Sequence, residues 1–249
     1  MSEPPDVDAL PHPLPPLAAR YEGMPGTMQG GYVASIAAGD RTGPIRVRIR
    51  RPLRAGDLLE RAVDGDKWEV RRTGELVMVG APTTMHVSDP GPLDLATALD
   101  AARQPLPFDP PFPACVGCGD RPDSLGLRIR PMPAARRMVA AWTPAGDGAV
   151  PCSDVWTVTD CITSWCVFVD PPTHGGGSAV TGNIAMQFLA DLEAGRTYLY
   201  QSWRERDDER SIICGGAIHD TDGNLVALAD QELVRVEGNG MKIPDAPLC

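Results

Sequence analysis

The stretch Gly26-Thr27-Met28-Gln29-Gly30-Gly31-Tyr32-Val33-Ala34 opens a run of small and apolar residues that continues to Ala38. Residues 45–51, Ile-Arg-Val-Arg-Ile-Arg-Arg, follow in alternating apolar and basic order. Small apolar residues over 29–38 indicate a buried helix, and a period of two indicates a strand with one buried face. We therefore expect a glycine-rich turn, a buried helix and an alternating strand at the start of the folded part of the chain.

Further strand-like runs follow in the N-terminal half. They are rich in apolar and β-branched residues and lie at 58–63, 68–72 and 76–79. Thr73-Gly74-Glu75 separates the last two as a hairpin turn, because glycine adopts the positive φ angles that tight hairpins need. This half is predicted to be one helix followed by an antiparallel meander.

The C-terminal half repeats this order. Strand-like runs at 127–130 and 138–142 precede a helix-like run at 154–168. Four long strand-like runs come next, at 179–192, 197–204, 211–219 and 225–236. Asp222-Gly223-Asn224 supplies a hairpin turn between the last two. A helix with an antiparallel meander, present twice, predicts an α+β fold in which a sheet wraps a long helix in each half.

Proline-rich segments divide the chain. The segment from Pro105 to Pro113 excludes a helix or a central strand, because proline lacks the N–H that both require. Residues 94–103, just before it, form a predicted short helix packed on the first half. The predicted parts are a Pro-rich leader, an N-terminal domain, a helix with its connector and a C-terminal domain, at residues 1–16, 17–92, 93–113 and 114–249.

Composition excludes several classes of protein. Of the 249 residues, 43% are hydrophobic and 22% are charged, which is the balance of a globular chain. The net charge of −10 opposes binding to the phosphates of nucleic acids. No apolar run approaches the roughly 20 residues that span a bilayer. Residues 1–6 lack the basic start and apolar stretch of a secretory signal. We therefore expect a cytoplasmic protein that binds neither nucleic acid nor membrane.

The seven cysteines are irregularly spaced, which fits reduced thiols better than a disulfide framework. Cys115 and Cys118 form a Cys-x-x-Cys pair, and a redox role for it stays open. A structural zinc needs four ligands, and the sequence has no second pair of this kind, so no metal is predicted. No phosphate-binding loop or dinucleotide fingerprint occurs, so no cofactor is predicted either.

The quoted residues carry a family resemblance. The stretch Gly26 to Ala34, followed by Arg46 to Pro52, resembles the hotdog-fold acyl-CoA thioesterases, and more narrowly their phenylacetic-acid-degradation type. In that type a His-Gly-Gly turn opens the central helix. Cys115-Val116-Gly117-Cys118-Gly119 and Leu125 to Arg128 are similar to its entry strand. The resemblance covers about residues 20–80 and 115–236.

The resemblance implies two tandem hotdog domains that form an intramolecular double hotdog. In such proteins the active site lies at the seam between the helices, where one helix supplies backbone amides and the other an acid. One seam site would join Gln29-Gly30-Gly31 with Asp160, and the other would join Pro151-Cys152-Ser153 with Ala38. Alanine cannot do acid–base chemistry, so one hybrid active site is expected.

Each residue of that site has an expected role. The amides of Gly30 and Gly31 would stabilise the charge on a thioester carbonyl oxygen, although two glycines also serve close helix packing. Asp160 would be a general base or nucleophile, and a solvent-facing or purely structural aspartate is the alternative. Gln29 replaces the family's histidine, so it can hydrogen-bond a carbonyl but cannot titrate. Ser164, one turn after Asp160, would position water or the carboxylate.

Substrate-binding residues are expected on two strands. Arg46, Arg48 and Arg50 share one face of the alternating strand, where guanidinium groups would bind the phosphates of coenzyme A. A solvated strand face is the alternative. Ser178, at the start of a later strand, is a further candidate for lining the substrate pocket.

The leading functional hypothesis is a cytoplasmic hydrolase of fatty acid metabolism, an acyl-CoA or related acyl thioester thioesterase. A non-catalytic acyl or acyl-CoA binding protein is the alternative, because Gln29 and Ala38 depart from the family pattern. Hydration or dehydration is favoured least, since the run 154–168 contains no histidine. A dimer of double hotdogs is compatible with the family, and the length and aromaticity of the acyl group stay open.

Overall fold

The computed structural model describes residues 11–39, 43–169, 173–174, 176–238 and 240–243. The helices within those residues are α1 (Gly30–Ala38), α2 (Leu95–Arg103) and α3 (Cys152–Trp165), with 3-10 turns at Ala19–Tyr21, Pro133–Ala135 and Cys166–Phe168. The strands are β1 (His12–Pro13), β2 (Ile45–Ile49), β3 (Leu59–Asp64), β4 (Lys67–Arg72), β5 (Glu75–Pro82), β6 (Arg130–Met132), β7 (Arg137–Trp142), β8 (Gly177–Phe188), β9 (Tyr198–Asp207), β10 (Ser211–Asp220), β11 (Leu225–Val236) and β12 (Met241–Ile243).

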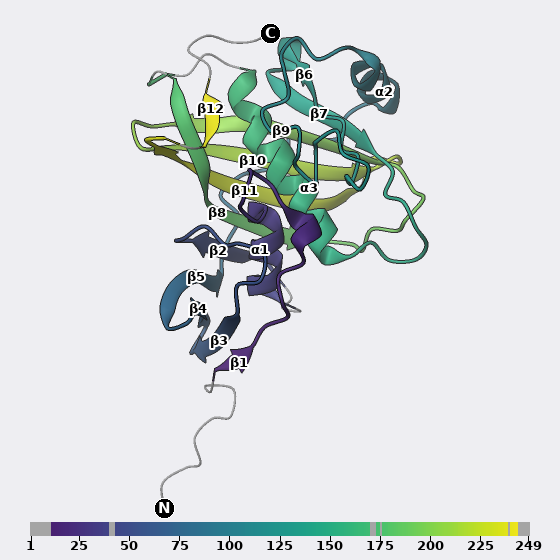
Figure 1. Cartoon of the computed structure of the whole chain (residues 1–249). Coiled ribbons are helices and arrows are strands. Elements are labelled where there is room, and N and C mark those ends of the chain that lie inside the picture. Colours follow the sequence, from purple (N-terminus) through teal and green to yellow (C-terminus); the bar gives the residue numbers. More distant parts are fainter. Residues whose placement is uncertain (1–10, 40–42, 170–172, 175, 239, 244–249) are drawn as a thin grey trace, which may run out of the picture.

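All strands of the described residues belong to one antiparallel sheet, with the order β1-β3-β4-β5-β2-β8-β11-β10-β9-β7-β6 and with β12 paired to β8. Strands β2 and β8 join the two halves of the chain, with Ile45 opposite Met186 and Arg48 opposite Asn183. Figure 1 shows the strands of the first half continuing into those of the second half across this pair. The expected α+β class with an antiparallel meander in each half is confirmed.

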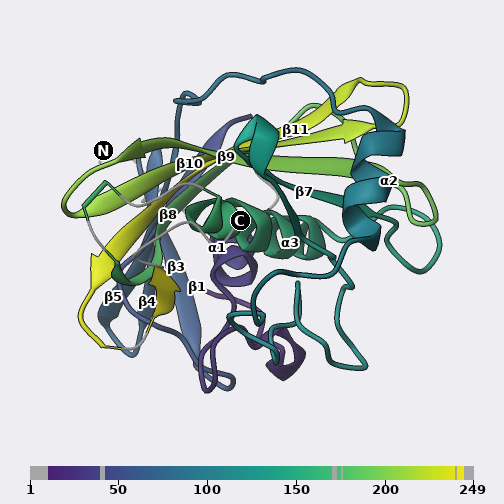
Figure 2. The same ribbon diagram turned by 90° about the horizontal axis from the view of Figure 1, so that it is seen from above.

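Helices α1 and α3 lie side by side on the same face of this sheet, which curves around them (Figure 2). Helix α1 packs on β2, β5 and β8, and α3 packs on strands β7 to β11. A small residue allows this close contact, because a Cβ atom on Gly31 of α1 would collide with the α3 backbone at Trp156. Along α3, polar residues are as buried as apolar ones, and Thr157 and Thr163 have no exposed surface. The helix seam is therefore a buried interior in which polar groups must find partners.

Helix α2 forms where residues 94–103 predicted it, with the Asp94 carboxylate accepting a hydrogen bond from the Thr97 N–H at 2.9 Å. The expectation that it packs on the first half is wrong, because it lies on β6 and β7 of the second half. The segment between β5 and α2 crosses the outer face of the second-half strands, where Val87 is buried against Ala217 and Leu228. The crossing segment is anchored by this apolar contact, and it connects β5 of the first half to α2 on the second half.

Most other elements match the sequence prediction, with shifts at their ends. The run expected at 127–130 enters the sheet only at Arg130, although Leu127 and Ile129 are buried. Strand β8 ends at Phe188 rather than at Leu192. The helix-like run at 154–168 is α3 followed by a 3-10 turn. Residues 1–10 of the expected leader lie outside the described residues, and β1 within it pairs with β3.

Within the described part of the chain, no helix is long and apolar enough to cross a membrane. The domain boundaries stay a prediction.

Candidate functional site

Asp160 lies at the centre of a buried hydrogen-bond network between α1 and α3. Its Oδ2 accepts hydrogen bonds from Gln29 Nε2 at 2.5 Å and from the Gly31 backbone N–H at 3.1 Å. Its Oδ1 accepts from Thr181 Oγ1 at 2.8 Å and from the side-chain amide of Gln231. The residue is only 5% exposed. The structure thus brings Asp160 together with the glycine turn, although 129 residues separate it from Gly31.

Gln29 connects the start of α1 to α3. Its Oε1 accepts a hydrogen bond from the Tyr32 N–H at 2.8 Å and so caps the helix. Its Nε2 donates to the Thr157 carbonyl at 3.0 Å as well as to Asp160. Glutamine is not among the preferred capping residues, so its residue type alone did not suggest this cap. The side chain therefore holds the carboxylate and the N-terminus of α1 in one arrangement.

Gly31 lies where the two helices approach most closely. A Cβ atom on Gly31 would lie 2.1 Å from the Trp156 carbonyl oxygen and 2.8 Å from Asp160 Cβ. Gly30 is less confined, since a Cβ there would meet Asp160 Oδ2 at 3.0 Å. Gly31 therefore serves close helix packing, which was the alternative interpretation for the two glycines. The same packing places the amide end of α1 against the carboxylate.

We expect Gly31→Ala to destabilise the protein by about 1–3 kcal/mol, the usual effect of forcing extra volume into a packed core. The clashing atom is backbone of α3, which cannot move without separating the helices. Gly30→Ala is the matched control, because a Cβ there would meet side-chain atoms at 3.0–3.2 Å rather than the backbone of α3. Urea unfolding of both variants checks this, and equal unfolding midpoints would contradict it.

Burial raises the pKa of Asp160 to about 6, because the charged form loses hydration. Hydrogen bonds from Thr181, the Gly31 amide and Gln231 favour the charged form and limit the rise. A carboxyl group with a pKa in this range exchanges protons readily near neutral pH. Burial thus gives this aspartate a pKa at which it can accept a proton near neutral pH.

A cavity opens beside the network. Four of its polar lining residues are Gln29, Asp160, Ser164 and Thr181. Its larger apolar lining residues are Met24, Met28, Phe112, Trp165, Leu233 and Met241. A carboxylate at one end of an apolar cavity, next to a helix N-terminus, can activate water beside a bound acyl group.

No known family model matches the sequence, and neither does any curated protein. Solved structures match it over most of its length. A protein from Novosphingobium aromaticivorans assigned as a thioesterase has a TM-score of 0.59 at 12% identity, over 92% of this chain and 96% of its own. An acyl-CoA thioesterase II from Mycobacterium marinum has a TM-score of 0.57 at 16% identity, over 86% of this chain and 91% of its own. A protein of unknown function with a hotdog fold, from Alicyclobacillus acidocaldarius, has a TM-score of 0.58 at 14% identity, over 94% of this chain and 96% of its own.

The chain has the hotdog fold. At these identities the likeness to solved structures is one of fold. The narrower resemblance to the phenylacetic-acid-degradation type stays a prediction.

Ser164 and Ser178 were also predicted from the sequence as site residues, and the structure places only Ser164 among the residues that line the cavity. Ser164 lies at the cavity, where its Oγ accepts a hydrogen bond from Gln231 Nε2 at 3.0 Å. Ser178 is buried, and its Oγ accepts from Lys242 Nζ at 3.0 Å. On β8 it is Thr181 that reaches Asp160. Sequence reasoning missed Thr181 and Gln231, because only the register of β8 and β11 turns these polar side chains toward α3.

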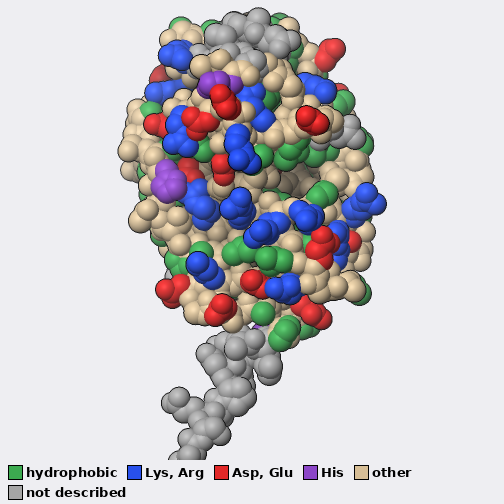
Figure 3. Space-filling view, turned by 90° about the vertical axis from the view of Figure 1, so that its left-hand side faces the viewer, with side chains coloured by type: hydrophobic (Ala, Val, Ile, Leu, Met, Phe, Trp, Pro, Cys, Tyr) green, Lys and Arg blue, Asp and Glu red, His purple; other side chains and the backbone are tan. Residues whose placement is uncertain are grey.

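The three arginines expected to bind phosphates differ in their surroundings. Arg46 forms an ion pair with Asp230 at 2.5 Å and donates to Asn183 Oδ1 at 2.8 Å. Arg48 and Arg50 are exposed. Figure 3 shows a row of Lys and Arg side chains across the middle of one face of the molecule, beside a hollow. Of these three arginines, Arg46 is therefore held in a structural ion pair, whereas Arg48 and Arg50 are exposed to an incoming ligand.

Proposed function

We propose that this protein is a thioesterase that hydrolyses acyl-CoA or a related acyl thioester. The observation that carries the proposal is the placement of Asp160 of α3 against the N-terminus of α1, at the edge of a largely apolar cavity. The hotdog fold, which the chain shares with solved thioesterases over most of its length, supports this proposal.

The proposal includes a double hotdog with one hybrid active site. Its support is the repeated helix-and-meander order, the contact of α1 with α3, and the pairing of β2 with β8. At the second position of the seam, Ala38 is buried and offers no acid. The chain would therefore have a single catalytic carboxylate at the seam, that of Asp160.

In the proposed reaction Asp160 removes a proton from a water molecule as the water oxygen attacks the thioester carbonyl carbon. Negative charge then develops on the carbonyl oxygen, which the Gly30 N–H at the start of α1 stabilises together with the helix dipole. The carbon–sulfur bond breaks, and the thiolate takes up the proton to leave as a thiol. Gln29 and Thr181 hold Asp160 in place through its two oxygens.

The acyl group would occupy the apolar part of the cavity. The flexible side chains of Met24, Met28 and Met241 adapt to different shapes, which favours an aliphatic or aromatic chain over a polar one. The exposed Arg48 and Arg50 stay candidates for binding the phosphates of coenzyme A.

One observation favours a binding protein instead. Both oxygens of Asp160 are already occupied by protein donors, and the Gly31 amide donates to Asp160 itself. A carboxylate held in this way has fewer acceptor positions for water. In this second candidate the cavity binds the acyl thioester without turnover.

Thiol release from short, medium, long and aromatic acyl-CoAs separates the two candidates. A thioesterase releases free thiol from at least one class at a rate proportional to enzyme concentration. A parallel titration with thioether analogues, which cannot be hydrolysed, measures binding alone. Binding without thiol release would replace the thioesterase by the binding protein, and neither binding nor release would refute both.

A further inference from the structure

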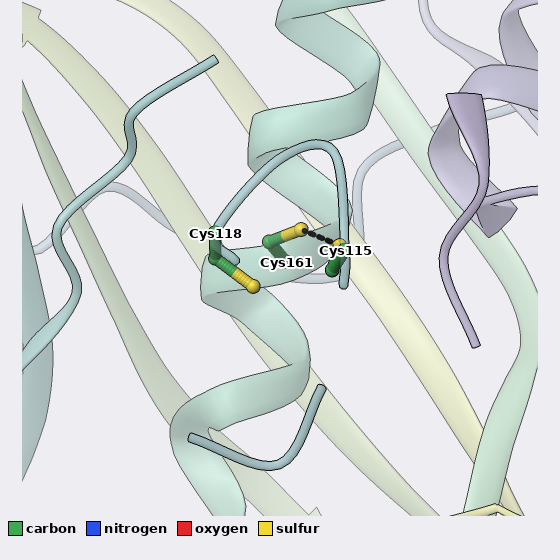
Figure 4. Close-up of side chains that lie close together, drawn as sticks. All are labelled: Cys115, Cys118 and Cys161. Atoms are coloured by element: carbon green, nitrogen blue, oxygen red, sulfur yellow. Dashed lines mark hydrogen bonds between the residues drawn. The ribbon is translucent and has the colours of Figure 1, made fainter. Parts of the chain in front are cut away.

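Three cysteines meet at the wall of the cavity, on the side of α3 that faces the loop before β6. Cys115 and Cys118 belong to that loop and Cys161 belongs to α3 (Figure 4). The three Sγ atoms lie within 4.8 Å of one another, and those of Cys115 and Cys161 are 3.6 Å apart. The sequence showed one Cys-x-x-Cys pair, and the fold adds the third sulfur.

We propose that Cys115, Cys118 and Cys161 bind a zinc ion through three thiolates. Tetrahedral zinc with Zn–S bonds of about 2.3 Å holds its sulfurs about 3.8 Å apart. The spacing of these sulfurs thus needs only small side-chain movements to reach that geometry. Each thiol loses its proton to solvent when the ion binds.

Each sulfur also receives an N–H donor, as the ligands of metal sites commonly do. The backbone N–H groups of Gly117 and Cys118 donate to the sulfur of Cys115. The Trp165 side chain donates to Cys118. The Gln29 side chain donates to Cys161 Sγ at 3.7 Å.

The loop is shaped to bring its sulfurs onto α3. A Cβ on Gly117 would lie 2.5 Å from Cys161 Sγ, so a side chain there would push the loop away from the helix. The Gly119 N–H donates to the Cys115 carbonyl at 2.8 Å and closes a tight turn between the two loop cysteines. The close approach of the loop to α3 therefore depends on glycine at position 117.

The cavity offers room for a fourth ligand. All three cysteines line it together with Asp160, and three protein ligands with one open position is the arrangement of catalytic zinc sites. Water or a small ligand from the cavity would complete the coordination. Sulfur ligands favour zinc over hard cations such as magnesium or calcium.

Cobalt titration of the full-length chain, reduced and freed of metal by a chelator, tests the proposal. We expect one Co²⁺ per chain with a thiolate charge-transfer band and intense tetrahedral visible bands, and displacement of this ion by Zn²⁺. Cys161→Ser should weaken zinc binding by about 100-fold or more. Loss of a group that only hydrogen-bonds a metal ligand already lowers metal affinity by about 10- to 100-fold, and Cys161 is a ligand itself. Cys152→Ser is the matched control, because Cys152 is an exposed cysteine of the same helix, and it should bind normally.

Alkylation of the wild-type chain gives a readout that needs no variant. Bound zinc should protect Cys115, Cys118 and Cys161 from alkylation and leave Cys152 reactive, as mapped by mass spectrometry. Free thiols without the cobalt spectrum, equal zinc affinity in Cys161→Ser, or a disulfide between two of the three sulfurs under reducing conditions would each overturn the proposal. None of these measurements depends on thioesterase activity.

Discussion

Asp160→Asn is expected to lower the rate of thiol release by about a hundredfold or more, the usual contribution of a general base. Asparagine keeps the size of the side chain and can still accept a hydrogen bond from the Gly31 amide, but it cannot take a proton from water. Affinity for a thioether acyl-CoA analogue should change much less, because the apolar lining of the cavity is unaltered. The measurement is thiol release against substrate concentration, with analogue binding beside it.

Asp154→Asn is the matched control for this substitution. Asp154 is also a buried carboxylate of α3, but its Oδ1 is held by Tyr21 OH and by Arg20, away from the glycine turn. We expect this variant to keep its activity within a few-fold. Thermal unfolding shows whether each variant is folded. A folded Asp160→Asn chain that turns over at the wild-type rate would remove Asp160 from the mechanism.

Arg46→Met is expected to destabilise the protein by about 3–5 kcal/mol, since it leaves a buried carboxylate without its counter-ion. Arg46 of β2 binds both oxygens of Asp230 on β11, at 2.5 and 3.0 Å, and the Asp230 side chain is only 2% exposed. The His86 backbone N–H, at 2.8 Å from Asp230, would remain as a neutral partner. The pair also links the two halves of the sheet, so its loss affects the joint between them.

Arg48→Met is the control, because Arg48 lies two residues further along β2 on the same face and is exposed. Surface substitutions of this kind usually change stability by no more than about 0.5 kcal/mol. The double variant Arg46→Met with Asp230→Leu should regain most of the lost stability, since it removes the unpaired charge. The free energies of unfolding come from urea titrations. If Arg46→Met and Arg48→Met unfold at the same urea concentration, the pair has no structural role.

The candidate site was predictable only in part. Gly30, Gly31 and Asp160 were named because a resemblance links a glycine turn to an acid on another helix, and the structure does bring them together. Gln231, 71 residues after Asp160, could not be found in this way. Its side chain reaches the carboxylate because of the position of β11 under α3, and no local pattern encodes that position.

The sequence by itself determined the local elements of this protein. The small residues of 29–38, the alternation in 45–51 and the glycine turns depend on residues that are neighbours in the chain. The helix formed at 30–38 and the strand at 45–49, within the predicted ranges. Only the tertiary structure decided that α2 packs on the second half and that Arg46 binds Asp230. It also decided that Cys161 joins the Cys-x-x-Cys pair. The physical reason is that such contacts depend on strand register and helix packing, which the whole core sets together.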